Sequence, residues 1–210
     1  TDMSALLGKQ DFIDAYNDGK WIDWIDEVSG NTATTQKYSL SVSSGTEKTK
    51  LFASTSYNRE EGLLNNENLN RYSLRLNLDQ QIFSWAKVGF TSNLVYRDLN
   101  SGVKNTFTKS LSAIPLGDAS TEKGEINHEY ITGQYSPMSD FIENQYVDNT
   151  RSTYLNMSGY VELTPVKDLT FTSRVNGTLN HSRRGQYWGE KCNANRPSYA
   201  GSPHASITNN

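Results

Sequence analysis

The feature that most constrains the fold is a strict alternation of apolar and polar residues over residues 72–79, Tyr-Ser-Leu-Arg-Leu-Asn-Leu-Asp. A period of two predicts a β-strand with one apolar and one polar face, not a helix. Arg75 and Asp79 on the polar face, with Arg71 just before them, need water or partners and cannot lie in a dry core. The apolar face must therefore contact either another layer of protein or lipid.

The same alternation recurs and predicts about six strands in three hairpins. Several strands keep it for about ten residues, whereas strands of soluble proteins average about five or six. Short turns alternate with long loops, which is the layout of outer-membrane barrels, with turns on one rim and loops on the other. The strands are expected near residues 38–43, 51–57, 72–79, 88–97, 155–163 and 169–180, the turns at 45–48, 80–85 and 164–168, and the loops at 58–70, 98–152 and from His181 onward.

Residues 1–30 differ, because their apolar residues recur every three or four positions and predict short amphipathic helices. The acidic residues on these turns are interpreted as a solvated helix face. One further helix is predicted within residues 103–113, ahead of Pro115. The sequence thus divides into a helical or irregular segment, residues 1–30, and a β-rich part, residues 31–210, which contains the long loop 98–152.

Composition and charge exclude several functions. The formal net charge is -3 and gives no basic patch, so nucleic acid is not expected as a partner. No run of about 18 apolar residues predicts a membrane-spanning helix, and the single cysteine, Cys192, forms no internal disulfide. Six strands in lipid would leave two unpaired edges, so further strands are needed and we expect the chain to be an excerpt of a longer protein.

No catalytic constellation is visible. His128, His181 and His204 are scattered through expected loops without the spacing of metal ligands. There is no nucleophile elbow and no phosphate-binding loop. We therefore expect no enzyme, no metal and no cofactor. Glycosylation acceptors at Asn156 and Asn176 fall within expected strands and are interpreted as chance matches.

Aromatic and charged residues suggest how the strands are used. Tyr38, Tyr57, Tyr72 and Tyr96 lie at strand ends, where an aromatic girdle would contact lipid head groups, and Trp85 lies at the opposite rim. The alternative interpretation is ordinary packing at the edge of a β-sandwich. The polar residues expected to face an aqueous lumen are Arg71, Arg75, Lys87 and Arg174, and the loop residues expected to contact a substrate or a lid are Tyr130, Tyr135 and Phe141.

Five runs of residues, taken in order, resemble the SusC/RagA family of TonB-dependent outer-membrane transporters. They are 23–28 (Asp-Trp-Ile-Asp-Glu-Val), 38–45 (Tyr-Ser-Leu-Ser-Val-Ser-Ser-Gly), 47–54 (Glu-Lys-Thr-Lys-Leu-Phe-Ala-Ser), 57–62 (Tyr-Asn-Arg-Glu-Glu-Gly) and 70–78 (Asn-Arg-Tyr-Ser-Leu-Arg-Leu-Asn-Leu). Each run is weak by itself, but their order and spacing match the start of the family's barrel, just after its plug. The resemblance covers residues 21–97, and 152–180 fit less distinctively.

The resemblance implies an all-β fold: an antiparallel transmembrane β-barrel segment, about six strands of a 22-stranded plugged barrel, with short N-terminal helices and one long extracellular loop. It also implies the outer membrane of a Gram-negative bacterium, outer-membrane lipid as a partner, a SusD-like lipoprotein as lid, energy supplied through TonB, and an oligosaccharide or peptide as cargo. No plug and no TonB-contacting segment are recognised in the sequence. Two alternatives remain: a soluble cell-surface β-sandwich that binds carbohydrate, and a passive porin.

Overall fold

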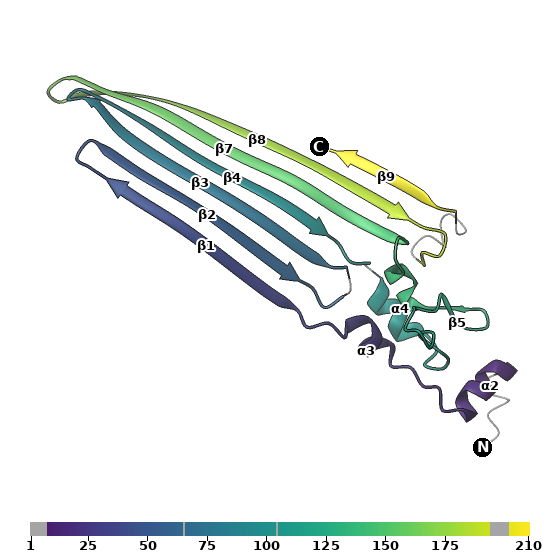
Figure 1. Cartoon of the computed structure of the whole chain (residues 1–210). Coiled ribbons are helices and arrows are strands. Elements are labelled where there is room, and N and C mark those ends of the chain that lie inside the picture. Colours follow the sequence, from purple (N-terminus) through teal and green to yellow (C-terminus); the bar gives the residue numbers. More distant parts are fainter. Residues whose placement is uncertain (1–7, 65, 104, 194–201) are drawn as a thin grey trace.

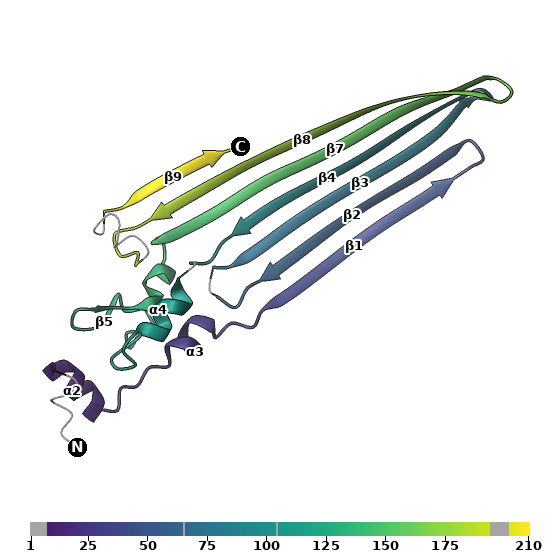
Figure 2. The same cartoon turned by 180° about the vertical axis from the view of Figure 1, so that it is seen from behind.

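The computed structural model describes residues 8–64, 66–103, 105–193 and 202–210. It consists of one long antiparallel sheet with a small, mainly helical unit at one end (Figure 1). No second sheet covers either face of the long sheet in this part of the chain, as the view from behind also shows (Figure 2). The mostly antiparallel β architecture predicted from the sequence is therefore confirmed.

The long sheet is a meander in which neighbours in the chain are neighbours in the sheet. Its order is β1-β2-β3-β4-β7-β8-β9, and every pair is antiparallel. The strands are β1 (Thr34–Gly45), β2 (Thr49–Glu61), β3 (Asn68–Phe83), β4 (Ala86–Asn100), β7 (Tyr146–Val166), β8 (Leu169–Trp188) and β9 (His204–Asn209). All six expected strands are present, and each is longer than the sequence pattern predicts.

The predicted bounds of three loops are wrong. The loop predicted at 58–70 shrinks to the connection between Glu61 and Asn68, because β2 and β3 extend into it. β7 begins at Tyr146 inside the predicted loop 98–152. The chain after His181 is not all loop, because β8 continues to Trp188 and β9 adds a seventh strand. Polar residues outnumber apolar ones in these extensions, and apolar residues such as Val147, Tyr187 and Ile207 are too far apart to give a sustained alternation.

The register places like side chains on the same face. Residues directly opposite each other in an antiparallel pair point to one side of the sheet. Tyr72 is opposite Tyr57 on one side and Tyr96 on the other, and Leu78 is likewise opposite Leu51 and Phe90. The apolar positions of all the strands therefore share one face, which we call the apolar face, and the other is the polar face.

The helical unit joins two distant segments, and we call it the cap, residues 9–29, 101–103 and 105–145. It contains α2 (Gln10–Asn17), α3 (Trp24–Ser29), α4 (Thr106–Ser112), the hairpin β5 (Glu129–Ile131) and β6 (Gln134–Tyr135), and the 3-10 helix η1 (Pro137–Phe141). The side chain of Asp23 caps α3, because its Oδ1 accepts from the backbone N–H groups of Ile25 and Asp26. Helices thus occur in both segments for which the sequence predicts them. None of the described helices has the length and hydropathy to cross a membrane.

The hydrophobic core of the chain lies in the cap, not in the sheet. Ile22, Trp24, Val28, Ala119, Tyr130, Met138 and Phe141 form one buried cluster. The indole of Trp24 stacks edge-on against Tyr130, with ring centroids 4.7 Å apart, and its Nε1 donates to the carbonyl of Ile114 at 2.9 Å. This hydrogen bond joins residues 90 positions apart in the sequence.

On the polar face, the position of Gly89 leaves no room for a side chain. Tyr160 lies directly opposite Gly89, and a β-carbon at this glycine would clash with the Tyr160 ring. We expect Gly89→Val to lower the free energy of unfolding by about 1–3 kcal/mol, as overpacking does. The matched control is Gly177→Val, because a β-carbon at Gly177 meets nothing within 4 Å. Urea titrations of the whole gene product that contains this chain, refolded in detergent micelles, measure the free energy of unfolding of both variants. Equal losses for Gly89→Val and Gly177→Val would contradict the packing of Gly89 against Tyr160.

Candidate functional site

The apolar face is exposed along most of its length. Val175 is 73% exposed and Leu74 is 51% exposed, although both side chains belong to regular strands. Large apolar side chains in water are unfavourable by about 25 cal/mol per Å² of surface, and a contiguous patch of this kind marks an interaction surface. The exposed large side chains of this face include Leu40, Val42, Leu51, Leu74, Phe90, Met157, Val161, Phe171, Val175 and Leu179.

A row of four tyrosines borders this apolar face on the side of the cap. Tyr38, Tyr57, Tyr72 and Tyr96 are directly opposite one another in β1, β2, β3 and β4. Their ring centroids are 6.4, 5.0 and 6.1 Å apart in that order. The sequence places each tyrosine at a strand end, and the register joins them into one continuous row, which we call the tyrosine row.

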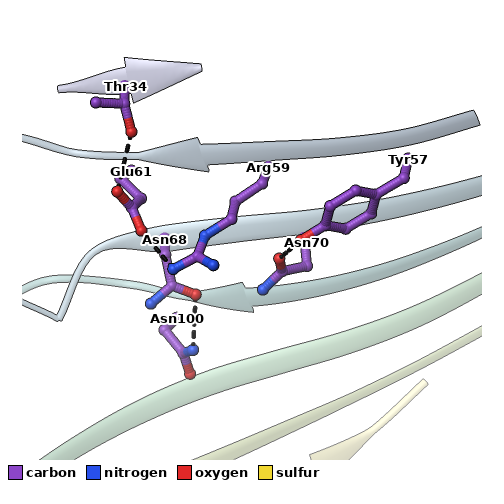
Figure 3. A network of polar contacts seen from close by, with 7 residues as sticks. All are labelled: Thr34, Tyr57, Arg59, Glu61, Asn68, Asn70 and Asn100. Atoms are coloured by element: carbon purple, nitrogen blue, oxygen red, sulfur yellow. Dashed lines mark hydrogen bonds and ion pairs between the residues drawn. The ribbon is translucent and has the colours of Figure 1, made fainter. Parts of the chain in front are cut away.

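Polar side chains replace apolar ones immediately beyond the tyrosine row (Figure 3). The hydroxyl of Tyr57 donates to Asn70 Oδ1 at 2.8 Å. Glu61 accepts from Thr34 Oγ1 at 2.9 Å and from Arg59 Nη2 at 2.5 Å, and Asn100 donates to Asn68 at 3.0 Å. Across β1 to β4, this face of the sheet therefore changes from apolar to hydrogen-bonded polar within one residue pair.

At the far end of the sheet the short turns also carry aromatic residues. Phe83 and Trp85 stack with ring centroids 5.2 Å apart, and both rings are about half exposed. Trp85 thus lies at the rim opposite the cap, as the sequence indicates, in the two-residue turn between β3 and β4. The apolar face is bordered by aromatic side chains at both ends.

The four cationic residues that the sequence predicts to face a lumen all lie on the polar face. The register places Arg71, Arg75, Lys87 and Arg174 on this one face. Near the turns, Lys87 Nζ and Arg174 Cζ each lie 5.5 Å from the centroid of Tyr160, whose hydroxyl donates to Asp79. Nearer the cap, Arg71 is directly opposite Arg97. Whether this face lines a lumen stays a prediction.

The three aromatic residues predicted to contact substrate or a lid do not share one surface. Tyr130 and Phe141 are buried, 4% and 9% exposed, within the hydrophobic cluster of the cap. Burial raises the pKa of the Tyr130 hydroxyl, which accepts a hydrogen bond from the N–H of Ile114 at 3.0 Å. Tyr135 is 40% exposed and its ring lies 5.1 Å from that of His128. Of the three, Tyr135 alone presents its ring to solvent.

A hollow of about 420 Å³ lies where the cap joins the sheet, and its lining includes Phe141, Asn100 and Tyr146. Buried Asp148 also lines this hollow, and its carboxylate accepts from Arg184 at Nε (2.8 Å) and Nη2 (2.5 Å), and from Gln186 at 3.1 Å. Sequence reasoning missed this network, because it assigned both partners to loops. Longer strands would have revealed it, since Asp148 and Arg184 then share the polar face.

The sequence predicts that all three histidines lie in loops, and this is wrong for two of them. His181 lies in β8 opposite Thr153, and His204 lies in β9, where it stacks on Trp188 with ring centroids 4.5 Å apart. His128, in the cap, contacts Ser139 Oγ at 3.1 Å. Within the described ranges, no group of three or more potential ligands could hold a metal ion.

Comparison with known proteins agrees with this architecture. A TonB-dependent receptor, P26, of Formosa agariphila is 25% identical over 169 residues, which cover 79% of this chain and 17% of the receptor. No protein-family model matches the chain. The resemblance to the SusC/RagA type of TonB-dependent transporter predicted from the sequence is confirmed by this relative together with the structural similarity described next.

Solved structures of the RagAB peptide importer share the fold. The structure in the open-open state has a TM-score of 0.65 at 23% identity and covers 90% of this chain and 23% of the solved chain. A second RagAB structure has a TM-score of 0.66 at 23% identity and covers 81% and 20%. This chain thus spans about a fifth of the length of these proteins, which are named as a TonB-dependent receptor, a peptide transporter and a peptide importer.

Proposed function

We propose, from the similarity to SusC/RagA-type TonB-dependent transporters, that this chain is part of the wall of an outer-membrane nutrient importer. The observation that carries the proposal is the exposed apolar face bordered by the tyrosine row. Tyrosine rings sit at the level of the lipid head groups because one end of the ring system is apolar and the other is polar. Lipid would then cover the apolar face, and no protein layer is needed there.

The height of the apolar face fits a bilayer. On β4 the face runs from Tyr96 in the tyrosine row to Ala86 at the turn. These ten steps span about 33 Å along the strand at about 3.3 Å per residue. At a tilt of about 35–45° the projected height is about 23–27 Å, and the apolar band of outer-membrane barrels is about 25 Å tall.

The two remaining parts of the proposal concern closure and cargo. The sheet would belong to a plugged barrel of 22 strands, because open edges in lipid leave backbone N–H and C=O groups unpaired. The polar face, with Arg71, Arg75, Lys87 and Arg174, would line the lumen. The cap would lie on the extracellular side, since long connections mark that rim. There Tyr135 could meet a SusD-like lipoprotein or an oligosaccharide or peptide, with energy supplied through TonB.

A labelling experiment tests which face meets lipid. In a Cys192→Ala background, single cysteines at Leu76 and Asn77 are introduced into the whole gene product that contains this chain. In intact outer membranes, Asn77→Cys should react with a water-soluble maleimide and Leu76→Cys should not, because the two residues point to opposite faces. A soluble β-sandwich, the alternative, would need no membrane; equal labelling of both cysteines in detergent-free buffer would contradict the proposal.

Transport itself is tested in cells. Removal of the gene should abolish growth on the peptide or oligosaccharide that the protein imports, and loss of TonB should have the same effect. Growth that depends on the gene but is indifferent to TonB would support a passive porin instead. The same strain gives a direct test of the cap, because Tyr135→Ala should weaken uptake while Glu122→Ala, on an exposed cap turn, should not.

A further inference from the structure

A second hollow, of about 440 Å³, lies on the apolar side of the sheet just beyond the tyrosine row. β4, β7, β8 and β9 all contribute to its lining, with side chains that point to the same side as the apolar face. Gly185 forms part of it, and a β-carbon there would meet nothing within 4 Å. The hollow is thus open to whatever covers this side of the sheet.

Two arginines line this hollow directly opposite each other. Arg151 in β7 pairs with Arg183 in β8 in the sheet register. Like charges at directly opposite positions destabilise a sheet. Arg151 has a carboxylate partner, Asp98, at 3.3 Å, whereas none of the ion pairs among the described residues involves Arg183. The lining therefore carries one more positive than negative charge.

The rest of the lining consists of apolar Val147 and Ile207 and of the amides Asn100 and Asn149, and Asn149 holds its one carboxylate. Asn149 Nδ2 donates to Asp98 Oδ1 at 2.6 Å and to Asn100 Oδ1 at 2.7 Å. Asp98 therefore accepts a hydrogen bond from Asn149 and forms an ion pair with Arg151. The two guanidinium groups are left as the strong donors toward solvent, with 60% of the Arg151 side chain exposed.

The height of the hollow relative to the tyrosine row identifies its surroundings. Tyr96 is opposite Thr153, and Thr153 is opposite His181, so these residues continue the row across β7 and β8. Arg151 and Arg183 come two residues further toward the cap, about 7 Å along the strands. If the tyrosine row marks the lipid head groups, the arginines lie among those head groups on the side of the long connections.

We propose that the hollow bounded by Arg151 and Arg183 binds the phosphate of a lipid head group in the outer leaflet of the membrane. A phosphate neutralises the opposed guanidinium groups and accepts paired N–H donors from each of them. The inference rests on the proposed function, because it requires the apolar face to be covered by lipid. It adds a bound lipid as a specific partner of β7 and β8.

The test uses the whole gene product that contains this chain, purified and placed in phosphatidylcholine vesicles with lipid A, a phosphorylated glycolipid, or with lipid A stripped of phosphate. Binding is measured by native mass spectrometry after mild extraction. We expect the double variant Arg151→Gln/Arg183→Gln to retain about a tenth or less of the phosphorylated lipid. Gly185→Leu fills the hollow without removing charge and should have the same effect. Lys48→Gln, at the opposite rim, should not.

The possible outcomes distinguish a failure of the lipid site from a failure of the proposed function. Failure of every variant and the wild type to insert into vesicles would overturn the proposed function. Normal insertion with equal retention of both lipids, or with full retention by the double variant and Gly185→Leu, would overturn the lipid site alone. Displacement of the lipid by millimolar inorganic phosphate would assign the site to a free anion and likewise overturn the inference. If the double variant does not fold, Gly185→Leu decides the result.

Discussion

Replacing Val175 with arginine should prevent stable assembly of the protein in a bilayer. Val175 is 73% exposed on the apolar face, six residues from His181 at the tyrosine row and four from Phe171 near the turn. This places it close to the middle of the apolar band. An arginine at the midplane of a barrel's lipid face costs about 2–4 kcal/mol, whereas the cost near the interface is about 0–1 kcal/mol.

The matched control for this substitution is Asn176→Arg. Asn176 is the next residue of β8 and lies at the same depth, but it points to the polar face, where Arg174 already lies. Urea titrations in phosphatidylcholine vesicles, read by the heat-dependent gel shift of folded barrels, give the free energy of unfolding of each variant. Equal losses for Val175→Arg and Asn176→Arg would show that the two faces of the sheet meet the same surroundings.

The second large effect concerns the cap. Trp24→Ala should unfold the cap and leave the sheet intact, because the indole is 3% exposed, packs on Tyr130 and donates to the carbonyl of Ile114. Truncation of a buried tryptophan to alanine costs about 3–5 kcal/mol. Limited proteolysis with mass spectrometry should then show rapid cleavage within residues 101–145, while the strands stay protected.

Trp21→Ala serves as its control, because Trp21 lies three residues earlier in the same segment and is 61% exposed. Its removal should change the cleavage rate little. If Trp24→Ala also destroys the heat-dependent gel shift of the sheet, the cap and the sheet do not fold as separate units. If neither variant is cleaved faster, the hydrophobic cluster does not hold the cap together.

The sequence by itself determined the strands wherever one face is apolar. Alternation at residues 72–79 located β3, and the tyrosines at the strand ends marked where the apolar face stops. It failed beyond the tyrosine row, where Arg59, Asn70 and Arg183 lie in strands that look like loops. Outside the apolar band both faces of a strand meet water or polar partners, and no difference between even and odd positions is then needed.

Only the tertiary structure decided how distant segments combine. The register joined Tyr38, Tyr57, Tyr72 and Tyr96 into one row, and it set Arg151 opposite Arg183. Neither pairing can be read from one strand, because opposite residues are far apart in the chain and depend on the turn lengths between them. The cap is a further case: local periodicity predicts helices, but it does not say that Trp24 will be buried against a segment 90 residues away.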